Sequence, residues 1–162
     1  MAKVLTSVFI VCVAASAWAQ EAGVMTVTDE ADPEVAAATV EDTLFFEATE
    51  VSLDEFLWTK RPVVVFADTP ADPRYVEQLE LLRARPDALI ARDVVVIIDA
   101  DPSANSDVRR TLRPRGFQLT LIEKDGRVNL RKPLPWDVRE ITRAIDKWPL
   151  RQEEIRKGRA AE

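Results

Sequence analysis

Residues 62–67 read PVVVFA and residues 94–98 read VVVII. Both runs are continuously apolar and rich in β-branched side chains, which is typical of strands covered on both faces in the centre of a sheet. Between them, Asp72 followed by Pro73 is a favourable helix start, because a carboxylate caps the helix and proline suits the first helical position. A strand, a helix and a strand of this length predict a right-handed parallel crossover.

The chain beyond this unit predicts a hairpin. An Asp-Gly pair at 125–126 lies between two extended segments, residues 117–122 and 127–131, and such a pair is a strong signal for a tight turn. In the second segment Val128 and Leu130 are expected to face the same side, as on an exposed edge strand.

Three further segments predict helices around the strands. A serine cap and a glutamate three residues later begin a short helix over residues 53–59. Residues 106–112 predict a weaker helix. Residues 136–148 carry apolar side chains at spacings of three and four, which predicts an amphipathic helix. Pro149 is expected to end it.

This order of elements resembles the thioredoxin fold, in which a mixed four-stranded sheet carries helices on both faces. The resemblance implies an α/β fold class but, being one of fold, no particular function. A narrower resemblance involves five stretches: Trp58 to Pro62, Gln78-Leu79, Arg92-Asp93, Lys124-Asp125-Gly126 and Ile145 to Gln152. In these stretches the sequence is similar to a thioredoxin-like bacterial family catalogued as domain of unknown function 4174. We therefore predict a thioredoxin-like domain over residues 44–150 and a basic carboxyl-terminal tail over 151–162.

The amino-terminal residues predict export. Residues 1–19 begin with a lysine near the start, continue with an apolar core and end in Ala-Trp-Ala, which fits a signal peptide cleaved after Ala19. A retained membrane anchor is the alternative, but an apolar core of about twelve residues is short of the roughly twenty that span a bilayer. Residues 20–43 are acidic and lack a sustained hydrophobic period, which is typical of a flexible leader. We expect a periplasmic or secreted protein with no stable membrane span after cleavage.

The sequence contains one cysteine, Cys12, and no histidine. Cleavage would remove Cys12, which excludes disulfides, thiolate nucleophiles, Cys or His zinc sites and histidine catalysis from the mature chain. The resemblance to thioredoxin places Pro-Ala-Asp-Pro, residues 70–73, where that fold carries its Cys-x-x-Cys pair, and Gln118 at its cis-proline. We therefore expect a domain without the Cys-x-x-Cys pair or a cofactor, and a non-catalytic binding or interaction module.

Two overlapping sites are predicted at the carboxyl ends of the parallel strands, where open α/β sheets bind ligands. Carboxylates gathered there suit Ca²⁺ or Mg²⁺ and give the alternative function, a metal-assisted hydrolytic enzyme. Aspartates after strands are also common caps and turn formers, so both interpretations stay open. The predicted ligand groove consists of Asp68, Pro70, Asp72, Tyr75 and Gln118. The predicted metal site consists of Asp68, Asp72, Asp99 and Asp101.

Charge is unevenly distributed along the chain. Residues 20–59 hold eleven acidic and no basic side chains, whereas residues 109–162 hold fifteen basic and eight acidic ones. The basic half predicts a surface for an anionic ligand or an envelope protein, and the negative net charge argues against nucleic acid. Pairing with nearby acids is the alternative, and docking of the acidic leader on this half stays open. The predicted surface consists of Arg109, Arg110, Arg113, Arg115, Arg127 and Arg131.

Overall fold

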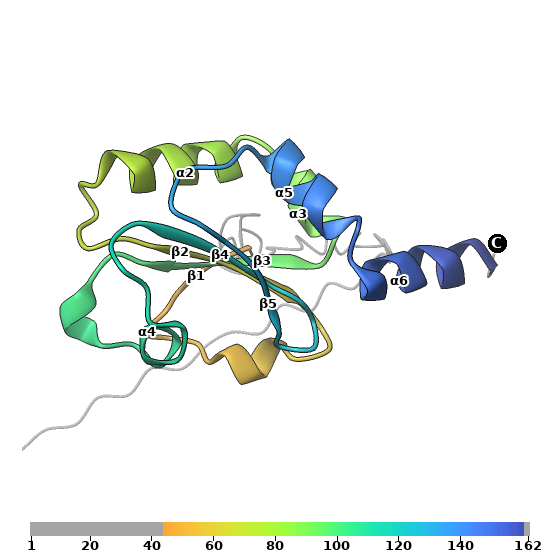
Figure 1. The fold of residues 1–162 in the computed structure, drawn as a ribbon, viewed down its shortest axis with the longest axis horizontal. Coiled ribbons are helices and arrows are strands. Elements are labelled where there is room, and N and C mark those ends of the chain that lie inside the picture. Colours follow the sequence, from red (N-terminus) through yellow and green to blue (C-terminus); the bar gives the residue numbers. More distant parts are fainter. Residues whose placement is uncertain (1–43, 161–162) are drawn as a thin grey trace, which may run out of the picture. The chain divides into compact units, whose positions relative to one another are not determined.

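The computed structural model describes residues 44–160, whose strands form one mixed five-stranded sheet (Figure 1). The strands are β1 (Phe45–Glu47), β2 (Arg61–Phe66), β3 (Val94–Asp99), β4 (Gln118–Ile122) and β5 (Val128–Lys132). They lie in the order β1-β3-β2-β4-β5. The first three are parallel, whereas β4 is antiparallel to β2 and β5 is antiparallel to β4. The predicted signal and leader lie outside the described residues.

The sequence analysis did not predict β1, the first strand of the sheet in chain order. It pairs in parallel with β3, with Phe45 opposite Val96 and Glu47 opposite Ile98. Three residues are too few for a hydrophobic period to stand out, so a strand of this length is found by its pairing and not by its pattern. The sheet is therefore mixed, as predicted, but has five strands where four were expected.

Helices cover both faces of this sheet (Figure 1). They are η1 (Leu53–Phe56), α2 (Pro73–Arg83), α3 (Pro86–Ile90), η2 (Pro102–Ala104), α4 (Asp107–Leu112), α5 (Val138–Ile145) and α6 (Pro149–Ala160). One core cluster lies between the sheet and α2, α3 and α5, and the other between the sheet and η1 and α4. On β2, Val63 and Val65 pack in the first cluster and Val64 and Phe66 in the second, each at most 1% exposed. Burial on both faces explains why the run is continuously apolar.

The helix starts agree with the predicted caps. Ser52 and Glu55 form the expected capping box, in which the backbone N–H of Ser52 donates to Oε1 of Glu55 at 2.8 Å. Asp72 caps α2 by accepting a hydrogen bond from the backbone N–H of Arg74 at 2.9 Å. The first helix is shorter than predicted, because Leu57, with a ψ of 131°, has left the helical region and Trp58, with a φ of 62°, has a left-handed backbone.

The hairpin of β4 and β5 forms as predicted, but the expected orientation of its side chains was wrong. Leu121 lies opposite Leu130 and Ile122 lies opposite Val128, so the register shifts between the two pairs. A β-bulge puts one extra residue on one strand and alters which faces the following side chains occupy. Leu130 consequently packs on the core cluster under α2 and α5, and Val128 on the opposite cluster.

The carboxyl-terminal helix also differs from the prediction. The helix expected over residues 136–148 covers only Val138–Ile145, and Pro149 begins α6 instead of ending the helical region. Proline lacks an N–H that the first helical position does not need, and its fixed φ suits that position. Between residues 44 and 160, no helix combines the length and apolar content required to cross a bilayer.

Candidate functional site

A buried ion pair between Asp99 and Arg109 lies at the carboxyl end of β3. The side chain of Asp99 is 4% exposed and that of Arg109 is 11% exposed. Arg109 donates to Oδ1 of Asp99 from Nε at 3.0 Å and from Nη2 at 2.8 Å. Ser106 donates from Oγ to Oδ2 of Asp99 at 2.7 Å. Both oxygens of this carboxylate are therefore engaged inside the protein.

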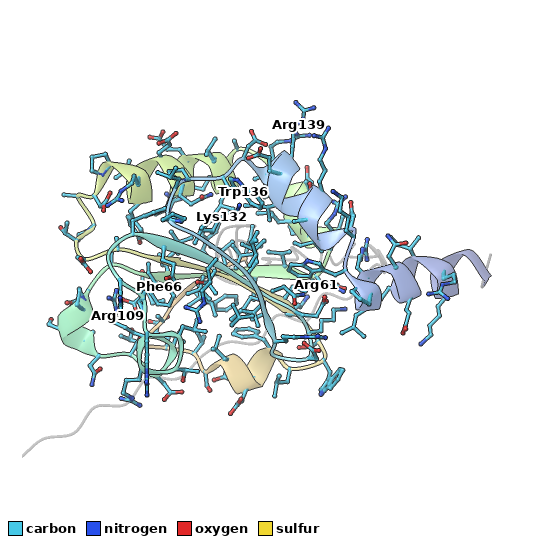
Figure 2. The ribbon with its side chains drawn as sticks, viewed as in Figure 1. Arg61, Phe66, Arg109, Lys132, Trp136 and Arg139 are labelled. Carbon is cyan, nitrogen blue, oxygen red and sulfur yellow. The ribbon has the colours of Figure 1, made fainter. Side chains whose placement is uncertain are left out.

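Arg109 also joins the ends of two neighbouring strands. Its Nη2 donates to the backbone carbonyl of Ala67, just after β2, at 2.8 Å. Its guanidinium lies 5.5 Å from the centre of the Phe66 ring (Figure 2). Ser106 caps α4 by accepting a hydrogen bond from the N–H of Arg109 at 3.0 Å, which fixes where this arginine leaves the helix. Arg109 was predicted to face a partner, but its Nε and Nη2 donate within the domain.

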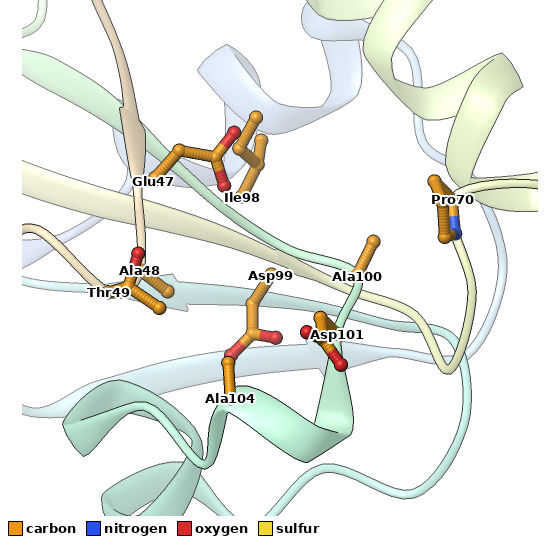
Figure 3. Close-up of a pocket in the computed structure, with 9 residues that line it drawn as sticks. All are labelled: Glu47, Ala48, Thr49, Pro70, Ile98, Asp99, Ala100, Asp101 and Ala104. Carbon is orange, nitrogen blue, oxygen red and sulfur yellow. The ribbon is translucent and has the colours of Figure 1, made fainter.

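An open cavity of about 220 Å³ lies beside this ion pair, at the carboxyl ends of β1 and β3. Figure 3 shows Glu47 and Ile98 on one part of its lining and Pro70 on another. Among the predicted groove and metal residues, Pro70, Asp99 and Asp101 line it. Partial burial, together with neighbouring carboxylates, raises the pKa of Glu47. The cavity therefore combines apolar walls with a negative rim.

The other predicted groove residues lie elsewhere. Tyr75 is 7% exposed and packs in the core cluster, and burial raises its pKa to about 12. Gln118 begins β4 and donates from Nε2 to Oγ1 of Thr120 at 2.8 Å. The side chain of Asp68 is 65% exposed. The structure thus does not assemble the five residues into one groove, and Tyr75 does not face a ligand space.

The four predicted metal ligands also do not converge. Asp72 caps α2, and the hydrogen bond from the side chain of Arg74 lowers its pKa. Asp101 caps η2, and the hydrogen bond from the side chain of Ser103 lowers its pKa. Within residues 44–160, no three acidic side chains lie close enough together to hold a metal ion. Asp72 and Asp101 therefore serve as caps, the role that the sequence left open.

Of the remaining arginines of the predicted anionic-partner surface, three contact acidic side chains or a backbone carbonyl and two form no ion pair with the described residues. The exposed Arg110 pairs with Asp107 at 2.8 Å, and the exposed Arg127 pairs with the partly buried Asp125 at 3.0 Å. Arg131 donates from Nη1 to the carbonyl of Leu112 at 2.8 Å. Arg113 and Arg115, the last two residues of this predicted surface, are exposed, and no ion pair is found for either among residues 44–158.

A second buried charge cluster, which the sequence analysis did not predict, surrounds Arg61 at the amino end of β2. The side chain of Arg61 is fully buried, and its Nε donates to Oε1 of Glu123 at 3.0 Å. Its Nη2 donates to Oε1 of Glu154, on α6, at 2.9 Å. Lys124 joins this carboxylate to Asp93 through contacts of 2.9 and 2.8 Å. The cluster therefore connects α6 to the amino end of β2.

Comparisons with known proteins identify the family. The family model DUF4174, described as a domain of unknown function, matches residues 52–154. The chain belongs to this family. No curated protein sequence matches the chain.

This DUF4174 domain has a thioredoxin-like fold, to which the solved structure of a peroxiredoxin is similar. The reduced 2-Cys peroxiredoxin of Plasmodium vivax is 15% identical, with 59% of this chain and 81% of that chain covered and a TM-score of 0.50. A chloroplastic thioredoxin z is 19% identical, with 64% of this chain and 91% of that chain covered and a TM-score of 0.49. At these identities the likeness concerns the fold alone.

Most of the stretches that suggested DUF4174 meet at the Arg61 cluster. Arg92 donates from Nε and Nη2 to the two carboxylate oxygens of Asp146 at 2.8 and 2.7 Å. Arg151 contacts Glu154 at 3.1 Å and Asp146 at 3.7 Å. Burial alone would raise the pKa of Glu154, but hydrogen bonds from the surrounding cations outweigh it and lower the pKa to about 2. Residues of this family resemblance therefore build the docking site of α6.

Proposed function

We propose that this DUF4174 domain is an exported binding module that uses a thioredoxin-like scaffold without thiol chemistry. The observation that carries the proposal is the Asp99–Arg109 ion pair at the carboxyl ends of β2 and β3, near the position where the scaffold would hold its reactive pair. Residues 70–73 supply the cap of α2 there instead of two thiols. A thiolate is the nucleophile of disulfide exchange, and residues 44–160 contain no cysteine to provide one.

The alternative function, metal-assisted hydrolysis, has less support. It needs carboxylates with free oxygens directed at one point. Asp99 is fully used by Ser106 and Arg109, and Asp72 and Asp101 hold helix caps. Exposed arginines, by contrast, remain available for an anionic ligand or partner, so we favour binding.

The proposal is tested with the insulin reduction assay on protein purified after export. We expect no acceleration of insulin precipitation over dithiothreitol alone, with thioredoxin as the positive control. Turnover of insulin by the purified protein would contradict the proposal. The same sample tests export, because its amino-terminal residue should be Gln20 by mass spectrometry. A chain that keeps Cys12 would contradict this part.

A further inference from the structure

A groove of about 310 Å³ lies between α3 and α5, on the helical layer away from the Asp99–Arg109 pair. Its lining is mostly polar and includes four arginines, whereas Asp146 is the one carboxylate among its lining residues. The arginines are Arg85, Arg92, Arg139 and Arg143. This concentration of guanidinium groups around one groove favours an anionic ligand.

The local structure explains why these arginines meet. Arg139 and Arg143 are four residues apart on α5, so they lie on the same side of the helix. The apolar side chains of Ile141 and Ile145 face the core, which leaves the arginines outward. Figure 2 shows Arg139 projecting from α5 away from the sheet. Arg85 enters from the segment before α3, which packs beside α5 (Figure 1).

The charges of the groove are not balanced. Asp146 already accepts hydrogen bonds from Nε and Nη2 of Arg92, at 2.8 and 2.7 Å, and lies 3.7 Å from Arg151. Among residues 44–158, no carboxylate forms an ion pair with Arg85, Arg139 or Arg143, all three of which are exposed. Three guanidinium groups therefore remain open to a ligand.

The donor arrangement indicates the class of ligand. A guanidinium binds two oxygens of a carboxylate or a phosphate through parallel hydrogen bonds. One carboxylate is satisfied by a single guanidinium, as Asp146 is by Arg92. Three open guanidinium groups offer more donors than two oxygens accept, whereas a phosphate group has more oxygens and a larger negative charge. We propose that the groove between α3 and α5 binds a phosphate group.

This site specifies the ligand class of the proposed binding module and rests on that proposal. The test uses the full mature protein and inorganic pyrophosphate, with binding measured by titration calorimetry. The double substitution Arg139→Gln with Arg143→Gln should weaken binding roughly tenfold or more, because charge-assisted bidentate contacts are lost. The matched control, Arg156→Gln with Lys157→Gln, removes the same charge from the exposed surface of α6, outside the groove, and should leave the affinity unchanged.

Three outcomes would overturn the phosphate site: no binding by the unaltered protein, equal weakening in both double variants, or full binding by the α5 variant. None of them depends on the insulin assay, so failure of this site and failure of the proposed function are distinguishable. A second arm identifies the source of the phosphate. Cosedimentation with phosphatidylglycerol vesicles, but not phosphatidylcholine vesicles, and its loss in the α5 variant would assign a lipid headgroup. Pyrophosphate binding without vesicle binding would assign a soluble phosphate ligand.

Discussion

At the scale of single residues, two buried arginines hold neighbouring elements of this domain together. Arg61 and Arg109 are both enclosed by the protein, and each is matched by a buried acid and by backbone carbonyls. Burying a charge is costly unless it is paired and hydrogen-bonded, so removing the acidic partner of either arginine should destabilise the fold. The two arginines lie at opposite ends of β2, where they hold different neighbouring elements in place.

Loss of the guanidinium of Arg109 should destabilise the domain strongly. The substitution Arg109→Met leaves Asp99 buried without its cation, which typically costs about 3–5 kcal/mol. Arg110→Met is the matched control, because Arg110 and its partner Asp107 are both more than half exposed, and exposed pairs contribute at most about 1 kcal/mol. Urea-induced unfolding of both variants measures the difference. Equal losses in the two variants would mean that the buried pair has no special role.

At the scale of elements, the turn of the β4–β5 hairpin depends on Gly126. Its φ is +81°, and a Cβ atom at this position would lie 2.9 Å from Cδ2 of Leu57. A left-handed backbone costs other residues about 1–2 kcal/mol, and the close contact adds to this. Gly126→Ala should therefore lower the free energy of unfolding by at least about 1 kcal/mol.

The control for this turn is the other alanine substitution, Gly158→Ala on α6. Nothing lies within 4 Å of a Cβ atom there, and alanine favours a helix over glycine by up to about 1 kcal/mol. This variant should be as stable as the parent or slightly more stable in the same urea titration. A stabilising Gly126→Ala would contradict the assigned turn geometry.

The elements also show which parts of the fold are readable from sequence. Asp72, Ser52 and the Asp-Gly turn act through neighbours within three residues, so their positions could be predicted. β1 and the bulge at Leu121 depend on pairing with distant strands, and no local pattern records such pairing. Of the four aspartates at the strand ends, Asp72 and Asp101 cap helices, as one alternative held, whereas Asp99 pairs with Arg109 and Asp68 is exposed.

At the scale of the whole molecule, the domain depends on ion pairs between residues that lie far apart in the sequence. Arg61 and Glu154 are 93 positions apart, and Arg92 and Asp146 are 54 positions apart. Their charges were visible in the sequence, but a charged residue beside a strand is ordinarily solvated, so burial could not be deduced. The resemblance to DUF4174 marked several of these residues without giving their role. That role is to fix α6 on the domain.

This role predicts an acid-dependent loss of stability. The carboxyl group of Glu154 has a pKa of about 2 in the folded protein, against 4.5 for the free group. A lowered pKa means that the stabilisation is complete above pH 4.5 and is lost as the pH falls toward 2. Glu154→Gln should be less stable than the parent at neutral pH, and the gap should narrow as the solution is acidified.

The exposed neighbour Glu153 provides the control for this pH effect, because it lies on the same helix and no ion pair is found for it among residues 44–158. Glu153→Gln should keep the parent's dependence of melting temperature on pH, measured from neutral pH to about 2. The hydrogen bond that Asp146 accepts from Arg92 is the main cause of its lowered pKa, and this aspartate is unchanged in all three proteins. Its contribution therefore cancels when the curves are compared. Parallel curves for the parent and Glu154→Gln would show that α6 is not held by this cluster.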